Sequence, residues 1–122
     1  MKTHHDLHVW QKSVEYVTDI YKTTSVFPTD EKFGLTNQIR RCGVSIPSNI
    51  AEGAARNSSK EFIRFLRISM GSAAELQTQL TIARNLKYIE THQFDTLMLR
   101  SIEISKMLSG LIHSINKKQS AS

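Results

Sequence analysis

Apolar residues recur along this chain at intervals of three and four, the spacing that places them on one face of an α-helix. The first such repeat predicts an amphipathic helix from about residue 7 to 25. Its apolar stripe consists of Trp10, Val14, Val17 and Tyr21. Phe27-Pro28 ends this helix, because the residue before a proline is disfavoured in the helical conformation, and Thr29 can cap the next one.

The second segment continues the helical spacing and includes a proline. Its stripe consists of Leu35, Ile39, Cys42, Ile46, Asn49 and Gly53. Pro47 has no N–H for the hydrogen bond to the residue four positions earlier, so this helix should kink near Pro47 or break there.

The third segment has the clearest separation of apolar and basic residues. Ser58-Ser59-Lys60-Glu61 predicts a capping box at its start. Lys60, Arg64 and Arg67 share one face at i, i+4 and i+7. The opposite, apolar face carries Phe62, Phe65, Leu66, Ser69, Ala73, Leu76 and Leu80.

A fourth helix, capped by Thr91, completes an all-α fold. Its stripe holds Phe94, Leu97, Met98, Ile104, Leu108, Leu111, Ile112 and Ile115. No segment alternates long enough to predict a strand, so we expect one antiparallel up-down four-helix bundle over residues 1–116, with a frayed polar tail over 117–122.

Several apolar residues fall outside these stripes. They are Tyr16 and Ile20 in the first helix and Leu99, Ile102 and Met107 in the fourth. Exposed apolar surface on a small helical protein is typical of a subunit interface, which favours a homo-oligomer. The alternative is a wide core-facing stripe with a few exposed apolar side chains, which is ordinary in monomers.

Charge and hydropathy limit the classes of partner that this protein is expected to bind. The net charge of the 122 residues is +5, and residues 34–74 alone hold six bases against Glu52 and Glu61. Such a cluster suits a polyanion, although many basic proteins bind none. No apolar run approaches the roughly 18 residues of a membrane span, and the amino terminus lacks the apolar stretch of a signal peptide, which predicts a cytoplasmic protein without a membrane partner.

No residue pattern supports catalysis, a metal site or a cofactor. Cys42 is the only cysteine, which excludes an intramolecular disulfide and a multi-cysteine zinc site. His4, His5 and His8 lack the Glu and third ligand of a metalloprotease, so a frayed terminus with solvated histidines is the better interpretation. Arg84 and His92 are too widely spaced for a helical RNase of the HEPN class. We therefore predict a protein that is not an enzyme.

The stretch from Arg40 to Gly53 allows two interpretations. In the structural one, Ser45, Ser48 and Asn49 satisfy carbonyl groups that Pro47 frees in a kinked helix. In the functional one, the same polar groups form a site beside Arg40 and Arg41. The structural interpretation is favoured.

The same residues carry a family resemblance. Val9-Trp10-Gln11-Lys12, Phe33-Gly34-Leu35 and Gln38-Ile39-Arg40-Arg41 precede the signature Ser45-Ile46-Pro47-Ser48-Asn49-Ile50-Ala51-Glu52-Gly53. Together they resemble the four helix bundle proteins encoded in intervening sequences of bacterial 23S ribosomal RNA genes. The resemblance covers about residues 7–85, with Ser45, Pro47, Asn49, Glu52 and Gly53 as its structural motif.

This resemblance implies a bundle that assembles into a ring, usually a pentamer. The chain is also similar to the accessory proteins of diversity-generating retroelements, which bind nucleic acid and a reverse transcriptase. By carry-over, the best candidates for phosphate contacts are Arg40, Arg41, Arg56, Lys60, Arg64 and Arg67.

Three functional hypotheses follow. The first is an oligomeric protein, without enzymatic activity, that binds RNA or DNA through those six bases. The second is a scaffold for a protein partner, in which the basic face is only solvated. The third, an enzyme, has the least support. Few aromatic residues lie among the bases, so we expect contacts mainly to phosphates and weak sequence preference.

Overall fold

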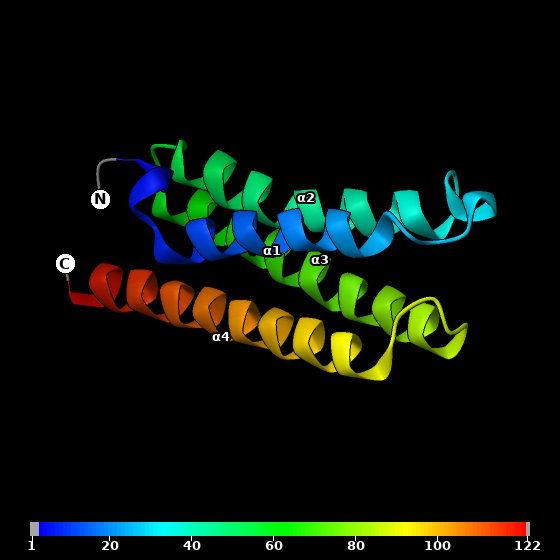
Figure 1. Ribbon diagram of the computed structural model, residues 1–122. Coiled ribbons are helices and arrows are strands. Elements are labelled where there is room, and N and C mark those ends of the chain that lie inside the picture. The colour runs from blue at the N-terminus through cyan, green and yellow to red at the C-terminus, as the bar shows by residue number, and fades with distance from the viewer. Residues whose placement is uncertain (1–2, 122) are drawn as a thin grey trace.

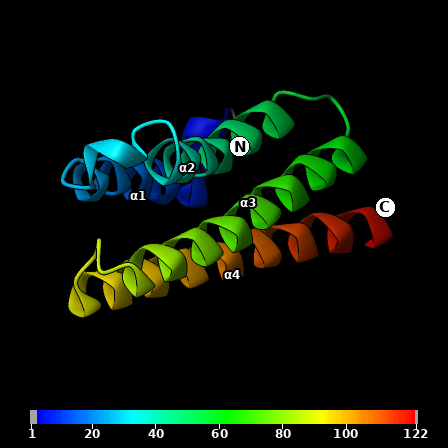
Figure 2. The same cartoon turned by 90° about the vertical axis from the view of Figure 1, so that its right-hand side faces the viewer.

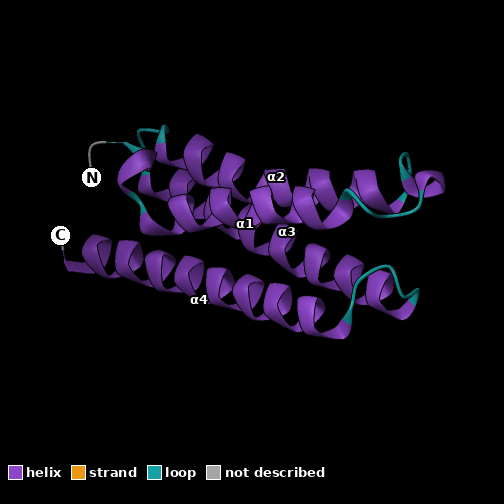
Figure 3. Ribbon diagram, viewed as in Figure 1, coloured by secondary structure: helices purple, strands orange, loops and turns teal. Residues whose placement is uncertain are grey.

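A computed structural model of the protein describes residues 3–121, and every regular element in that range is a helix (Figures 1 and 3). The four α-helices are α1 (His8–Thr24), α2 (Leu35–Ala54), α3 (Ser59–Asn85) and α4 (Thr91–Ala121), and two 3-10 turns are η1 (His4–Asp6) and η2 (Thr29–Glu31). Successive helices run antiparallel, and Figure 2 shows α1 and α2 in one layer and α3 and α4 in the other. This confirms the predicted antiparallel up-down four-helix bundle.

The hydrophobic core receives side chains from all four helices. No helix within residues 3–121 is long and apolar enough to cross a bilayer. The largest apolar side chains with no exposed surface are those of Tyr16, Ile20, Ile39, Ile46, Ile50, Leu66, Leu76, Leu80 and Leu108.

The stripe predicted for α1 is wrong in part. Tyr16 and Ile20, expected beside the stripe, are fully buried, whereas Val14 and Tyr21 are 38% and 42% exposed. The buried face of α1 includes Ser13, Thr23 and Thr24 as well. These hydroxyl residues hide the true face from a search for apolar spacing, because helical Ser and Thr can be buried once they donate to a carbonyl of the preceding turn. Ser13 and Thr24 do so, to Val9 O at 2.7 Å and to Ile20 O at 2.8 Å.

The start of α2 also differs from the prediction. Thr29 begins the short turn η2 and does not cap α2, which starts six residues later. The carboxylate of Glu31 supplies the cap instead, because its Oε1 accepts the N–H of Leu35 at 3.1 Å. Its Oε2 accepts the hydroxyl of Tyr88, which precedes α4, at 3.0 Å. Glu31 thereby joins both loops at this end of the bundle.

Helices α2 and α3 pack closely through small and hydroxyl residues. A Cβ placed on Gly53 would lie 2.6 Å from the Cβ of Phe65, so only glycine allows this approach. Further along the contact, the Ser69 hydroxyl donates to Ile46 O at 2.9 Å. α2 is continuous through Pro47, so the helix does not break there.

The capping box predicted at α3 forms only in half. The Ser58 hydroxyl accepts the N–H of Glu61 at 3.2 Å, as expected of an N-cap. The Glu61 side chain, however, is bound to Arg64.

At the other end of the chain, α4 continues to Ala121, so residues 117–121, where the sequence predicts a frayed tail, are helical.

Gly53→Ala should destabilise the protein, and Gly71→Ala should not. The new methyl at residue 53 would clash with the Phe65 Cβ, and such overpacking costs about 1–3 kcal/mol of unfolding free energy. Gly71 lies in α3, and a Cβ there meets nothing within 4 Å. Its replacement should therefore stabilise the protein by up to about 1 kcal/mol through helix propensity alone. Urea unfolding followed by circular dichroism measures both, and equal stabilisation by the two variants would contradict the close contact.

Candidate nucleic-acid interface

The outer face of α3 carries three bases in successive turns. Lys60, Arg64 and Arg67 are all exposed, as the i, i+4, i+7 spacing predicts. Within residues 3–121, the side chains of Lys60 and Arg67 make no hydrogen bond or ion pair. Their charges are therefore available to an anion in solution.

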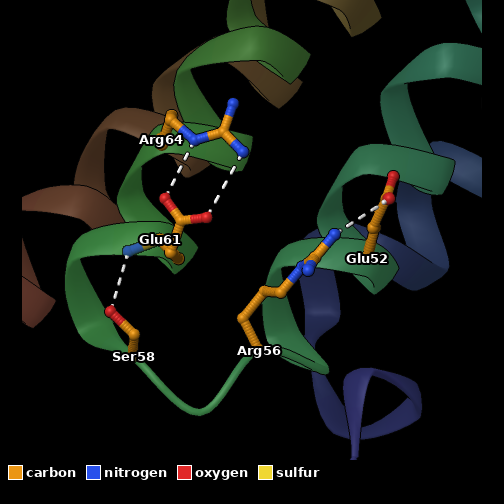
Figure 4. Close-up of polar contacts among 5 residues, drawn as sticks. All are labelled: Glu52, Arg56, Ser58, Glu61 and Arg64. Atoms are coloured by element: carbon orange, nitrogen blue, oxygen red, sulfur yellow. Dashed lines mark hydrogen bonds and ion pairs between the residues drawn. The ribbon is translucent and has the colours of Figure 1, made fainter.

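Arg64 is the paired member of this face (Figure 4). Its Nε donates to Glu61 Oε2 at 2.9 Å and its Nη2 to Oε1 at 3.4 Å. The pairing lowers the pKa of Glu61 and raises that of Arg64, chiefly through the hydrogen bond. Both side chains are solvent-accessible, where ion pairs are weak, so a phosphate can compete with Glu61 for this guanidinium.

Arg56, at the end of α2, approaches the same place from the other side. Its Nη2 lies 3.4 Å from Glu52 Oε1, and Figure 4 shows this pair facing the Glu61–Arg64 pair across the α2–α3 turn. The guanidinium carbons of Arg56 and Arg64 lie 5.1 Å and 4.5 Å from the centre of the Phe65 ring. The buried ring thus holds both cations near the turn through cation–π contacts.

The remaining two predicted phosphate contacts have different surroundings. Arg40 is partly buried and closes the end of α1: its Nε donates to Thr24 Oγ1 at 2.8 Å and its Nη2 to Tyr21 O at 3.2 Å. A cation at a helix C-terminus is favourable, so this side chain has a structural role that the sequence did not reveal. Arg41 is exposed, and no partner for it exists among the described residues.

Four of the six predicted bases therefore gather at the end of the bundle around the α2–α3 turn, which we call the basic end, whereas Arg40 and Arg41 lie in the first half of α2. The carboxylates of Glu52 and Glu61 offset two of the four charges on Arg56, Lys60, Arg64 and Arg67, so these six side chains sum to +2. The last turns of α4 lie at this same end (Figure 1) and add two lysines that the sequence analysis did not single out. These are the exposed Lys117 and Lys118.

The signature segment of α2 faces α3 more than solvent. Ser45 Oγ and Ser72 Oγ are 2.8 Å apart, and Asn49 Nδ2 donates to Ser45 O at 2.8 Å. Pro47 and Gly53 are buried, whereas Glu52 is exposed and pairs with Arg56. Ser45 and Gly53 thus meet α3 directly, Asn49 binds within α2, and Glu52 pairs with Arg56 at the basic end.

The amino-terminal histidines are ordered by an aromatic contact. Thr3 caps η1, and the rings of His4 and His5 lie 4.9 Å and 5.0 Å from the Trp10 ring. This differs from the frayed terminus expected from the sequence. Residues 3–121 contain no group of three His, Cys, Asp or Glu side chains placed to hold a metal ion.

Comparisons with known proteins identify a family whose model matches this chain and a solved structure with a similar fold. The family model of the 23S rRNA-intervening sequence proteins matches residues 5–110, which extends the resemblance seen in the sequence into α4. A solved structure from Bacteroides thetaiotaomicron, of a protein with unknown function from the S23 ribosomal protein family, is 30% identical with a TM-score of 0.79. The alignment covers 86% of this chain and 95% of that one. A comparison with curated proteins finds no match.

Proposed function

Because the chain belongs to the 23S rRNA-intervening sequence protein family, we propose that it is a self-associating protein, without enzymatic activity, that binds nucleic acid through the basic end of the bundle. The observation that carries this proposal is the exposed face of α3, where Lys60 and Arg67 form no hydrogen bond or ion pair with a described residue. The ligand is RNA, such as the intervening sequence of ribosomal RNA, or DNA.

The physical basis is phosphate neutralisation. Lys60 and Arg67 stand free beside Arg64, which a phosphate can detach from Glu61. The amino end of α3 adds the positive pole of the helix dipole close to Lys60. Each phosphate that these groups neutralise releases condensed counterions, so the affinity should fall steeply with salt.

Self-association would multiply this charge by repeating the basic end around a ring. Support comes from α4, where Leu99 is 68% exposed and Ile102 37% exposed on the outer face. Closed rings use two different patches of each subunit, and exposed apolar side chains are suited to such contacts. A pentamer is the assembly that the family resemblance favours.

The second candidate function is a scaffold for a protein partner, such as a reverse transcriptase. The same exposed Leu99 and Ile102 favour it, since a partner protein could cover them as well as another subunit could. Under this alternative the basic end is solvated and has no ligand.

Charge reversal of the free bases tests nucleic-acid binding. The Lys60→Glu/Arg67→Glu variant should lose at least about tenfold in affinity for a fluorescein-labelled 20-nucleotide RNA at 0.1 M salt, and its salt dependence should become shallower. The matched control is Lys22→Glu/Lys106→Glu, which changes the net charge equally at exposed residues of α1 and α4. Fluorescence anisotropy measures both, and circular dichroism verifies that they fold. Equal losses in the two variants, or none in either, would contradict a defined interface, and recovery of a protein partner without nucleic acid would favour the scaffold.

Light scattering coupled to gel filtration tests the assembly. We expect a mass several times the 13.9 kDa of one chain, and roughly 70 kDa for a pentamer. Leu99→Lys should lower this mass if α4 forms the contact, because a charge in an apolar interface is costly. A wild-type mass of one chain would refute self-association and leave the binding proposal to be judged on its own test.

A further inference from the structure

A polar groove lies between α2 and α3, apart from the Glu61–Arg64 and Glu52–Arg56 pairs. Its volume is about 430 Å³, within the range of small-molecule sites. Most of its lining is polar, and Phe33 is its one aromatic side chain. The side chains that line it include those of Phe33, Asn37, Arg41, Cys42, Glu75 and Gln79. We refer to it as the α2–α3 groove.

The floor of the α2–α3 groove lacks a hydrogen-bond donor. Gln79 is only 8% exposed, and its buried Oε1 has no partner within residues 3–121. A buried acceptor left without a donor costs free energy that folding must offset elsewhere. No described group supplies this donor, so the polar interior beside the groove is incompletely satisfied by the protein itself.

A second acceptor lies next to it in the groove. The Cys42 thiol lies 3.3 Å from Glu75 Oε2 and 3.2 Å from Ser72 O, so its one proton is shared between two acceptors. The Glu75 carboxylate forms no ion pair with any described residue. Burial, followed by the contact with Glu75, raises the pKa of Cys42 to about 12, so the thiol remains a protonated donor at neutral pH. One weak S–H donor leaves most of the hydrogen-bonding capacity of this carboxylate unused.

The rim of the groove provides two further groups that a nucleotide can contact. One is an aromatic ring on which the base can stack, and the other is a cation for the phosphate. The Phe33 side chain is 88% exposed, an unusual position for a phenylalanine. Lys32 Nζ lies over the ring, 5.5 Å from its centre, and a base can stack on this exposed ring. Arg41 is exposed without a partner and can reach a phosphate. The amide of Asn37 adds a side chain that can both donate and accept.

We propose that the α2–α3 groove binds one nucleobase of a single strand, with preference for guanine. The proposal rests on the proposed nucleic-acid function and specifies where a base is read. Guanine is the base that presents two adjacent donors, N1–H and N2–H, on one edge, which matches a carboxylate accepting both. Phe33 stacks on the base and Arg41 binds a neighbouring phosphate, while adenine and cytosine offer one amino group on that edge and uracil offers none.

Two labelled octamers of RNA test the preference. One is octauridine and the other carries a single guanosine at its fifth position, so that only the base changes. Fluorescence anisotropy should show about tenfold tighter binding of the guanosine octamer by the wild-type protein, as expected for one bidentate contact. Glu75→Gln should reduce this ratio to nearly one, because its amide replaces an acceptor by a donor. Asp95→Asn, a loss of the same charge at an exposed position of α4, should keep the ratio.

Phe33→Ala separates stacking from base readout. It should lower the affinity for both octamers by roughly tenfold, because stacking does not depend on the base. Phe33 and Glu75 are both exposed, so these variants should fold as the wild type does.

The outcomes distinguish the groove from the basic end. Equal binding of the two octamers, or an unchanged ratio in Glu75→Gln, overturns the groove proposal; loss of binding in Lys60→Glu/Arg67→Glu would still support the proposed function. No binding of either octamer overturns both. If Phe33→Ala lowers the mass measured by light scattering and leaves octamer binding unchanged, the Phe33 side chain is part of a subunit contact and the groove proposal is wrong.

Discussion

The close approach of α2 and α3 is the constraint on which the rest of the structure depends. Gly53 makes it possible, since any Cβ there would meet the Cβ of Phe65. Where the helices meet, the Ser69 hydroxyl binds Ile46 O, one residue before the proline. The same contact sets the position of the basic end, because Phe65 lies under both Arg56 and Arg64. Packing thus determines where the charges stand before any ligand is present.

Charge at the basic end is distributed unequally. Glu52 and Glu61 each hold one arginine, and these exposed pairs limit the repulsion among neighbouring cations without adding much stability. Lys60 and Arg67 have no such partner in the described part of the chain. The arrangement combines two paired guanidiniums with two unpaired cations, which suits an extended polyanion better than a single small anion.

Most of the fold could be predicted from apolar spacing, and α3 shows why. Most of its buried residues are apolar, Ser69 and Gln79 being the exceptions, and the face with Lys60, Arg64 and Arg67 is exposed as predicted. In α1 the rule failed, because Ser13 and Thr24 are buried with their hydroxyls bound to carbonyls. Spacing could not reveal the role of Arg40 either, since its partners Thr24 and Tyr21 belong to another helix. The α2–α3 groove was missed for the same reason: Glu75 and Arg41 come together only in the folded chain.

The most direct test of the central claim is the reactivity of individual lysines with and without nucleic acid. Brief acetylation followed by mass spectrometry reports each lysine separately in the wild-type protein. With a saturating single-stranded RNA, Lys60 should become several-fold less reactive, while Lys22 and Lys106, on the exposed surfaces of α1 and α4, keep their rates. If RNA is bound and Lys60 reacts as fast as in its absence, the free cations of α3 are not the binding surface.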